Sequence, residues 1–213
     1  MRCEEQRRSC FFALDLETSS NGRNGLVAEV IQVAICSIRL QGPNAPEITT
    51  VYNQWFNPTG SITEEAQRVH GKSKRDLERY PHFALTDAQN IFGLIKGSQG
   101  VVCHNYDFDR KILWQQFVRV SAQGLTDYRK WPKFHCTQKM ACKIGIKRAK
   151  SGLSDVLRNQ LGIERPGFHD AEFDARATAQ LWLHLRQYAP TQASSGETII
   201  GFSEPTNGKS PPF

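Results

Sequence analysis

Long apolar segments are missing from this 213-residue sequence, because no run approaches the roughly 20 residues that a membrane-spanning helix needs. The opening MRCEEQRRSC mixes acids and bases without an apolar core, so we expect no secretory signal there. Hydrophobic residues still make up 39% of the chain, which is enough for a sizeable core in one domain. We therefore predict an intracellular protein, cytoplasmic or nuclear, with no membrane as a partner.

Cysteine pairs of the CxxC type are absent as well, although the chain contains six cysteines. Their absence argues against a zinc knuckle and against a thioredoxin-like motif. His135, Cys136 and Cys142 lie close together, but their spacing fits no common zinc pattern. Reduced and mostly buried thiols are the better interpretation.

The charge balance indicates the partner only weakly. The formal net charge is +6 and the isoelectric point about 9.1, which suits a polyanionic partner but is also common elsewhere. Basic residues gather in three stretches, at 70–79, 128–133 and 143–150. Aromatic residues alternate with them in the second stretch, as a nucleic-acid groove would require. A solvated helix face explains any one stretch better when it is taken alone.

The order of the elements predicts an α/β fold. Three strands come first, at residues 10–17, 26–40 and 48–58. The short turns between them favour an antiparallel meander. Ser61 and Glu64 resemble a capping box before a helix that ends at Gly71. A further strand is expected at 100–105, and further helices at 86–97, 107–120, 151–162 and 169–188. This order indicates a mixed sheet with helices packed on it.

The ends of the chain are predicted to lie outside the folded domain. Residues 1–9 are interpreted as a flexible leader. Residues 189–213 are rich in Ser, Gly, Thr and Pro and are interpreted as a flexible tail. One domain is therefore expected to span residues 10–188.

Two carboxylates follow the first apolar run, FFALDLETSS at residues 11–20. Residues two apart on a strand point to one face, so Asp15 and Glu17 are expected side by side. Like charges this close repel unless a cation lies between them, and hard oxygen ligands suit Mg²⁺ or Mn²⁺. Two acids separated by one residue are very common, and the ordinary explanation is that the strand ends there and both side chains reach water.

Acids recur at two later positions. Asp107 and Asp109 fall in the first turn of a helix, where acids are common because they complement the helix dipole. His169 stands just before the last helix, and Asp174 follows on a helix whose alanines permit close packing against the sheet. If Asp174 points towards the sheet, its buried carboxylate needs a partner that compensates its charge. The alternative is an ordinary exposed acid, which needs none.

Taken together and in order, these motifs resemble the DEDD superfamily of 3′–5′ exonucleases. ALDLET resembles the first family motif, HNYDFD the second, which selects Asp109 over Asp107, and HDAEFDA the third. The histidine of the third motif is typical of the DEDDh branch, which includes ribonuclease T, oligoribonuclease and the proofreading exonuclease subunit of bacterial replicative DNA polymerase. The resemblance covers about residues 10–188. It departs from the family pattern at Ser19 and Ser20, where Thr-Gly is usual, and at Cys136.

The resemblance implies a fold and a chemistry. The fold is a ribonuclease H-like mixed five-stranded sheet flanked by helices. Two divalent ions, Mg²⁺ or Mn²⁺, would be held by Asp15, Glu17, Asp109 and Asp174. His169 would act as general base, and the five residues together would be catalytic. The reaction would hydrolyse DNA or RNA phosphodiesters from the 3′ end and release nucleoside 5′-monophosphates.

Substrate contacts are implied at Thr18, His70, Asn105 and Phe108, although a capping or core role explains each about equally well. The expected partner is single-stranded or 3′-end nucleic acid, and a polymerase or another nucleic-acid-processing protein is a candidate. The main alternative is a non-catalytic nucleic-acid-binding module on the same fold. Intact acids argue against it, because carboxylates alone would repel phosphate. An adaptor domain that acts through its tail is a third alternative.

Overall fold

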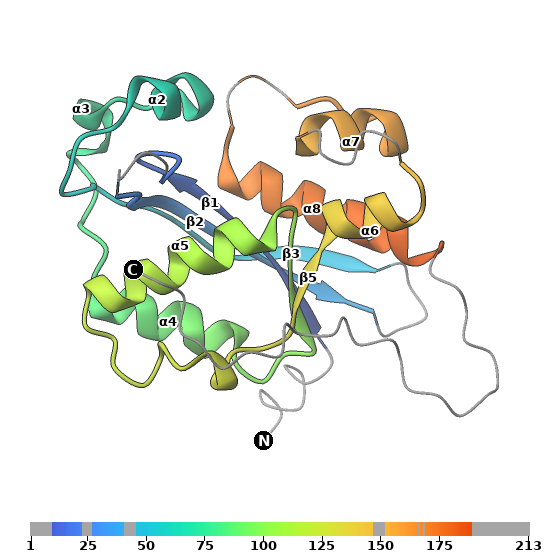
Figure 1. The fold of residues 1–213 in the computed structure, drawn as a ribbon, viewed down its shortest axis with the longest axis horizontal. Helices are drawn as coiled ribbons and strands as arrows, with labels where there is room; N and C mark the ends of the chain where they lie inside the picture. Colours follow the sequence, from blue (N-terminus) through green and yellow to red (C-terminus); the bar gives the residue numbers. More distant parts are fainter. Residues whose placement is uncertain are drawn as a thin grey trace.

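The computed structural model describes residues 10–22, 27–40, 46–146, 152–165, 167 and 169–188. The expected leader, the expected tail and residues 147–150 of the third basic stretch lie outside the described residues. A five-stranded sheet in the order β3-β2-β1-β4-β5 forms the centre of the molecule (Figure 1). Its strands are β1 (Cys10–Thr18), β2 (Val30–Arg39), β3 (Glu47–Trp55), β4 (Gly100–Cys103) and β5 (Phe134–Cys136).

The sheet is mixed, as the sequence predicts. β1, β2 and β3 pair antiparallel, which confirms the meander. β4 runs parallel to β1 and β5 runs parallel to β4. β2 begins at Val30 rather than at the expected residue 26. The ends of β1 and β4 that lead into the loops therefore meet at one edge, which is where the acidic residues stand.

The helices follow the predicted pattern with three local corrections. Their bounds are α2 (Glu64–His70), α3 (Lys74–Leu77), α4 (Leu85–Ile95), α5 (Tyr106–Arg119), α6 (Thr137–Lys143), α7 (Leu153–Leu161) and α8 (Ala171–Arg186), with a 3₁₀ turn η1 at Tyr128–Lys130. The expected Ser61 capping box is wrong, because Thr63 caps α2 and accepts a bond from the Ala66 N–H. Gly71 ends α2 with φ at 72°, as expected. Helices α3 and α6 were not predicted, and Ser73 with Asp76 forms a capping box at the start of α3.

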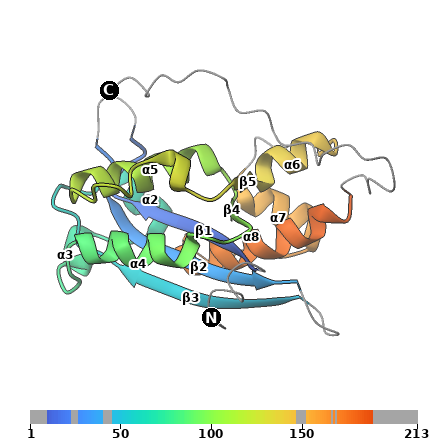
Figure 2. The same cartoon turned by 90° about the horizontal axis from the view of Figure 1, so that it is seen from below.

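The alternation of residues along β1 divides the core into two layers. Phe12, Leu14 and Leu16 face the helices α4 and α5. Ala13 faces the opposite way and packs against α8. Helices α6 and α7 lie beside α8 on this side of the sheet (Figures 1 and 2). A period of two thus gives β1 one apolar face and an opposite face that carries Ala13, Asp15 and Glu17.

Helix α8 lies close to the sheet because its buried face is made of small side chains. Ala171, Ala175 and Ala179 recur every four residues and are fully buried against Ala13 and its neighbours. Trp182 fills the space at the far end of the same face. Close packing brings the backbone of α8, and with it Asp174, towards the strand that carries Asp15.

Cys36, Cys103 and Cys136 are buried free thiols and Cys142 is an exposed one, as predicted, and Cys10 is buried as well. None of the helices described here is both long and apolar enough to cross a membrane.

Candidate active site

The first pair of acids lies where β1 leaves the core. Asp15 pairs in register with Ala34 and Glu17 with Gln32, and the register shifts between Glu17 and Thr18. Glu17 is only 6% exposed and Asp15 is partly buried. The strand therefore does not simply end in water. Both carboxylates stand on the α8 side of the sheet, opposite the apolar residues that alternate with them.

The second motif separates two acids that are two positions apart on α5. Asp109 is buried and lines the same pocket as Asp15. Asp107 is exposed, and its Oδ2 lies 2.7 Å from the Nζ of Lys139. The structure therefore turns Asp109 towards the acids of β1 and Asp107 towards the surface, as the resemblance implies.

The third motif enters the site at the N-terminus of α8. Asp170 caps the helix, because its Oδ1 accepts bonds from the N–H groups of Glu172 and Phe173. The His169 N–H donates to the Val69 carbonyl at 3.0 Å, which ties this loop to α2. Asp174 is 3% exposed, and its Oδ2 lies 3.7 Å from the Nδ1 of His169.

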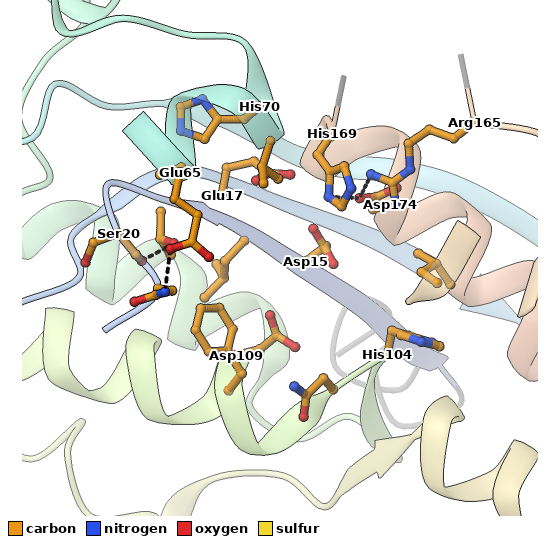
Figure 3. Close-up of a pocket in the computed structure, with 18 residues that line it drawn as sticks. Asp15, Glu17, Ser20, Glu65, His70, His104, Asp109, Arg165, His169 and Asp174 are labelled. Atoms are coloured by element: carbon orange, nitrogen blue, oxygen red, sulfur yellow. Dashed lines mark hydrogen bonds and ion pairs between the residues drawn. The ribbon is translucent and has the colours of Figure 1, made fainter. Parts of the chain in front are cut away.

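All nine residues predicted for the site line one cavity of about 290 Å³: Asp15, Glu17, Thr18, His70, Asn105, Phe108, Asp109, His169 and Asp174. The close-up in Figure 3 shows Asp109 facing Asp15 from α5, with His169 near Asp174. The side chains come from β1, α2, α5 and α8, which lie far apart in the sequence. The cavity is thus built where the strand ends meet the starts of two helices.

Burial and mutual repulsion disfavour the charged forms of the acids. Burial, followed by repulsion from the other acids, raises the pKa of Glu17 to about 8. Burial raises the pKa of Asp109 to about 8 as well. Burial raises the pKa of Asp15 well above its usual range, and three neighbouring carboxylates add to that effect. If all of them were ionised, the acids would carry more negative charge than the protein around them compensates, so Glu17 and Asp109 hold their protons at pH 7.

The histidines of the cavity are shifted in the opposite direction. Partial burial, followed by the nearby Arg165 guanidinium, lowers the pKa of His169 to about 4. The His169 side chain is nevertheless 45% exposed, so a molecule in the cavity can reach it. Burial also lowers the pKa of His70 to about 4. Both imidazoles are therefore neutral at pH 7.

The donor set fits a hard divalent cation. One ligand atom from each of Glu17, His169 and Asp174 lies within 4.8 Å of the others. The Oδ1 of Asp174 is buried and has no hydrogen-bond partner among the described residues. An unpartnered buried carboxylate oxygen beside other carboxylates is what Mg²⁺ or Mn²⁺ would satisfy. Asp15 and Asp109 lie outside this tight group but line the same cavity.

The four predicted substrate residues differ in how far ordinary structural roles explain them. The His70 Nδ1 accepts a bond from the Lys72 N–H, so His70 helps to end α2. Thr18 Oγ1 donates to the Ser20 carbonyl, which shapes the turn after β1. Phe108 packs against the core as well as the cavity. Asn105 occupies the N-cap position of α5, but its side chain makes no capping bond within the described chain.

Two residues that the sequence analysis missed also shape the site. Arg165 lies in the loop before α8, and its Nη1 is 2.6 Å from the Oδ2 of Asp174. Gln32 on β2 bonds to the first turn of α8. An arginine four residues before the motif histidine was a signal that was available for Arg165. Gln32 carried no signal, because a single glutamine in a strand of apolar residues is not distinctive.

Comparison with known proteins places the chain in a family. The model of the RNase T family, described as an exonuclease, matches residues 12–182. A search of curated proteins finds no match.

Solved structures with a similar fold include three nucleases. Exonuclease X, solved in complex with 5′ overhanging duplex DNA, is 18% identical with a TM-score of 0.54, over 84% of this chain and 92% of its own. E. coli Exonuclease I, in complex with a dA16 oligonucleotide, is 16% identical with a TM-score of 0.64, over 84% of this chain and 41% of its own. A 3′-exonuclease that recognises the 3′ end of a histone mRNA stem-loop is 16% identical with a TM-score of 0.64, over 85% of this chain and 83% of its own. At these identities the likeness shows the ribonuclease H-like fold.

Proposed function

The chain belongs to the RNase T exonuclease family, and on that premise we propose that residues 10–188 form a metal-dependent 3′–5′ exonuclease domain of the histidine-bearing DEDD branch. The observation that carries the proposal is the convergence of four carboxylates and His169, from separate elements, on one cavity. The reaction would hydrolyse the 3′-terminal phosphodiester of DNA or RNA and release a nucleoside 5′-monophosphate.

We propose that two divalent ions, Mg²⁺ or Mn²⁺, are held by Asp15, Glu17, Asp109 and Asp174. When bound, such ions neutralise the carboxylates, activate water and stabilise the charge that develops on the phosphoryl oxygens. The chain's own contribution is the spacing of the ligands. Asp15 and Glu17 are two residues apart on a strand, while Asp109 and Asp174 come from helices packed on opposite faces of the sheet. The core therefore sets the separation of the carboxylates.

His169 is proposed as the general base. A general base must be neutral in order to accept a proton, and the lowered pKa of His169 satisfies that requirement at pH 7. Its ring is exposed to the cavity on one side and lies near Asp174 on the other. A carboxylate beside the imidazole can orient the ring and stabilise the positive charge that it gains.

Contacts to the substrate are proposed for the backbone at Thr18, the side chain of Asn105, the ring of Phe108 and His70. Asn105 has the strongest support, because its amide lines the cavity and is not used as a helix cap. A base or sugar could pack on Phe108, which is partly exposed in the same wall. The partner would be single-stranded or 3′-end nucleic acid, in line with the ligands of the structural neighbours. A polymerase partner and an intracellular location stay predictions.

A test of the proposal uses DNA and RNA oligonucleotides of equal sequence, labelled at the 5′ end. We expect stepwise shortening from the 3′ end with Mg²⁺ or Mn²⁺ and none with EDTA. Asp109→Asn should abolish the shortening, whereas the matched variant Asp107→Asn should behave as wild type, because Asp107 faces the surface and pairs with Lys139.

Cleavage by Asp109→Asn at the wild-type rate would contradict the proposed ligand set. Binding of the oligonucleotide by the wild type without cleavage, with either metal present, would favour the non-catalytic binding module instead. Recovery of activity with Zn²⁺ but with neither Mg²⁺ nor Mn²⁺ would contradict the choice of metal.

A further inference from the structure

Arg165 is a buried cation in the wall of the acidic cavity, beside Asp174. Its side chain is 6% exposed, and its Nη1 lies 2.6 Å from the Oδ2 of Asp174, itself 4% exposed. The Nε of the same guanidinium donates to the Ser154 Oγ on α7 at 3.0 Å. The side chain thus reaches from the loop before α8 to the carboxylate. Figure 3 shows Arg165 and His169 both pointing towards Asp174.

We propose that Arg165 is a displaceable counter-ion: it pairs with Asp174 in the metal-free protein and, when a divalent ion takes that carboxylate, binds a phosphate oxygen of the nucleic-acid substrate. The inference rests on the proposed function, because it assigns Asp174 to the metal ligands. It adds a substrate-binding residue that none of the three sequence motifs contains.

Charge and geometry argue that the guanidinium and a metal ion compete. Arg165 lies against the Oδ2 of Asp174, and a metal ion would take the unpartnered Oδ1 of the same carboxylate, where two cations repel each other at close range. One arginine supplies a single positive charge against the five acidic residues that line the cavity, four of which are the proposed metal ligands. It therefore compensates only part of their charge, and a divalent ion compensates more. Replacement of Arg165 by the metal lowers the electrostatic energy of the group.

The chemistry of arginine argues for its second role. The guanidinium presents several N–H donors in a planar fork that matches the oxygens of a phosphate. Arg165 lines the cavity together with the proposed catalytic residues, so a freed guanidinium would remain beside the bound phosphodiester. Because its side chain starts in a loop rather than in α7 or α8, the rotation that this exchange needs leaves both helices in place.

A permanent structural ion pair is the competing explanation, and it predicts a different outcome. If Arg165 only holds the loop against α8, its removal should loosen the site and weaken the binding of metal and nucleotide alike. Competition predicts changes of opposite sign, because the guanidinium opposes the metal but assists the phosphate. Equilibrium binding distinguishes the two explanations without any measurement of activity.

The experiment is calorimetric titration of the full chain with Mn²⁺ alone, followed by titration with a nucleoside 5′-monophosphate at saturating Mn²⁺. For Arg165→Gln we expect tighter Mn²⁺ binding than in the wild type, and nucleotide binding weaker by about tenfold or more, the scale for losing a hydrogen bond to a charged group. The control is Arg158→Gln on α7. This substitution breaks an exposed ion pair between Arg158 and Glu164 and should change neither the Mn²⁺ affinity nor the nucleotide affinity.

Weaker or unchanged Mn²⁺ binding by Arg165→Gln would overturn the inference, provided that the wild type binds Mn²⁺. Failure of the wild type itself to bind Mn²⁺ would contradict the proposed function rather than the role of Arg165 alone. If Arg165→Gln does not fold by circular dichroism, Arg165→Lys serves as the second variant. Lysine keeps the positive charge but not the planar fork of N–H donors. We therefore expect this variant to fold and to bind the nucleotide more weakly than the wild type. Nucleotide binding at the wild-type level would overturn the inference.

Discussion

The Oε1 of Gln32 accepts a hydrogen bond from the backbone N–H of Ala171 at 2.9 Å, across 139 positions of sequence. Gln32 is fully buried on β2, next to Glu17 on the neighbouring strand. Its Nε2 also donates to the Oδ2 of Asp170, the residue that caps α8. One side chain of the sheet therefore fixes the start of the helix that carries Asp174 and the position of His169 just before it.

Replacement of Gln32 by leucine should loosen this connection without changing the size of the side chain greatly. It leaves the Ala171 N–H and one Asp170 oxygen without their partner, and we expect a loss of about 1–3 kcal/mol in unfolding free energy. Activity should fall as well, because α8 positions two of the proposed catalytic residues. Urea denaturation and the cleavage assay measure the two effects. Gln54→Leu on β3 is the control, and equal effects of both substitutions would contradict the anchoring role.

The metal-free protein should become less stable as the pH rises from about 7 to 8.5. The folded pKa values of Glu17 and Asp109 are raised to about 8, whereas both groups are fully ionised in the unfolded chain. The folded state therefore binds more protons in this window, and the two groups together lower its stability by roughly 2–3 kcal/mol as the pH rises. His169 and His70, with pKa lowered to about 4, act in the opposite direction only below about pH 6.5. Denaturation at several pH values in EDTA measures the slope.

Asp109→Asn supplies the internal control for this pH dependence. Asparagine cannot ionise, so the variant should be more stable than the wild type in EDTA at pH 8 and should lose part of the slope. Mg²⁺ should stabilise the wild type more than the variant, because binding to the folded state adds to stability. Asp107→Asn should stay near the wild type, since exposed ion pairs contribute little. If the unfolding free energy of the wild type did not change with pH in this range, the pKa values of Glu17 and Asp109 would not be raised in the metal-free protein.

His169→Ala should lower the cleavage rate by roughly 100-fold or more at saturating Mg²⁺, the usual scale for the loss of a general base. Mn²⁺ binding should persist, because the four carboxylates remain. Since the pKa of His169 is lowered to about 4, the wild-type rate should not depend on its titration between pH 6 and 8. The measurements are the rates of both proteins across that range. His184→Ala, on the same helix but outside the cavity lining, is the control. Equal rates for His169→Ala and wild type would show that His169 only precedes helix α8 and is not the general base.

Ala175→Leu should disturb the site through the packing of α8. Ala175 is fully buried between α8 and the sheet, next to Asp174. A larger side chain must push the helix away, and overpacking costs typically about 1–3 kcal/mol. We expect a lower melting temperature and a reduced rate from the displaced Asp174. Gln180→Leu puts the same residue on the exposed side of α8 and should leave both unchanged. A rate equal to wild type in Ala175→Leu would show that the close approach is not needed.

Local interactions along the chain made much of the fold predictable. The alternation of Phe12, Leu14 and Leu16 with Asp15 and Glu17 reports directly which face of β1 is apolar, because strand geometry has a fixed period. Gly71 ends helix α2 where the sequence predicts, in a left-handed conformation, and Gly162 ends α7 in the same way. The cap of α2 was misassigned, since Ser61 and Thr63 are both suitable caps and only the folded loop shows which one meets the helix.

By itself the sequence determined the order of strands and helices, the two faces of β1 and the identity of the motif acids, because each of these depends on residues close together in the chain. Only the tertiary structure decided that Arg165 pairs with Asp174, that Gln32 holds the start of α8, and that Asp107 turns outwards to Lys139. Gln32 and Lys139 lie far from their partners in sequence, and even the Arg165 pair depends on how the loop before α8 packs against α7. Such contacts follow from how the sheet and helices pack, and the packing is a property of the whole core rather than of any local pattern.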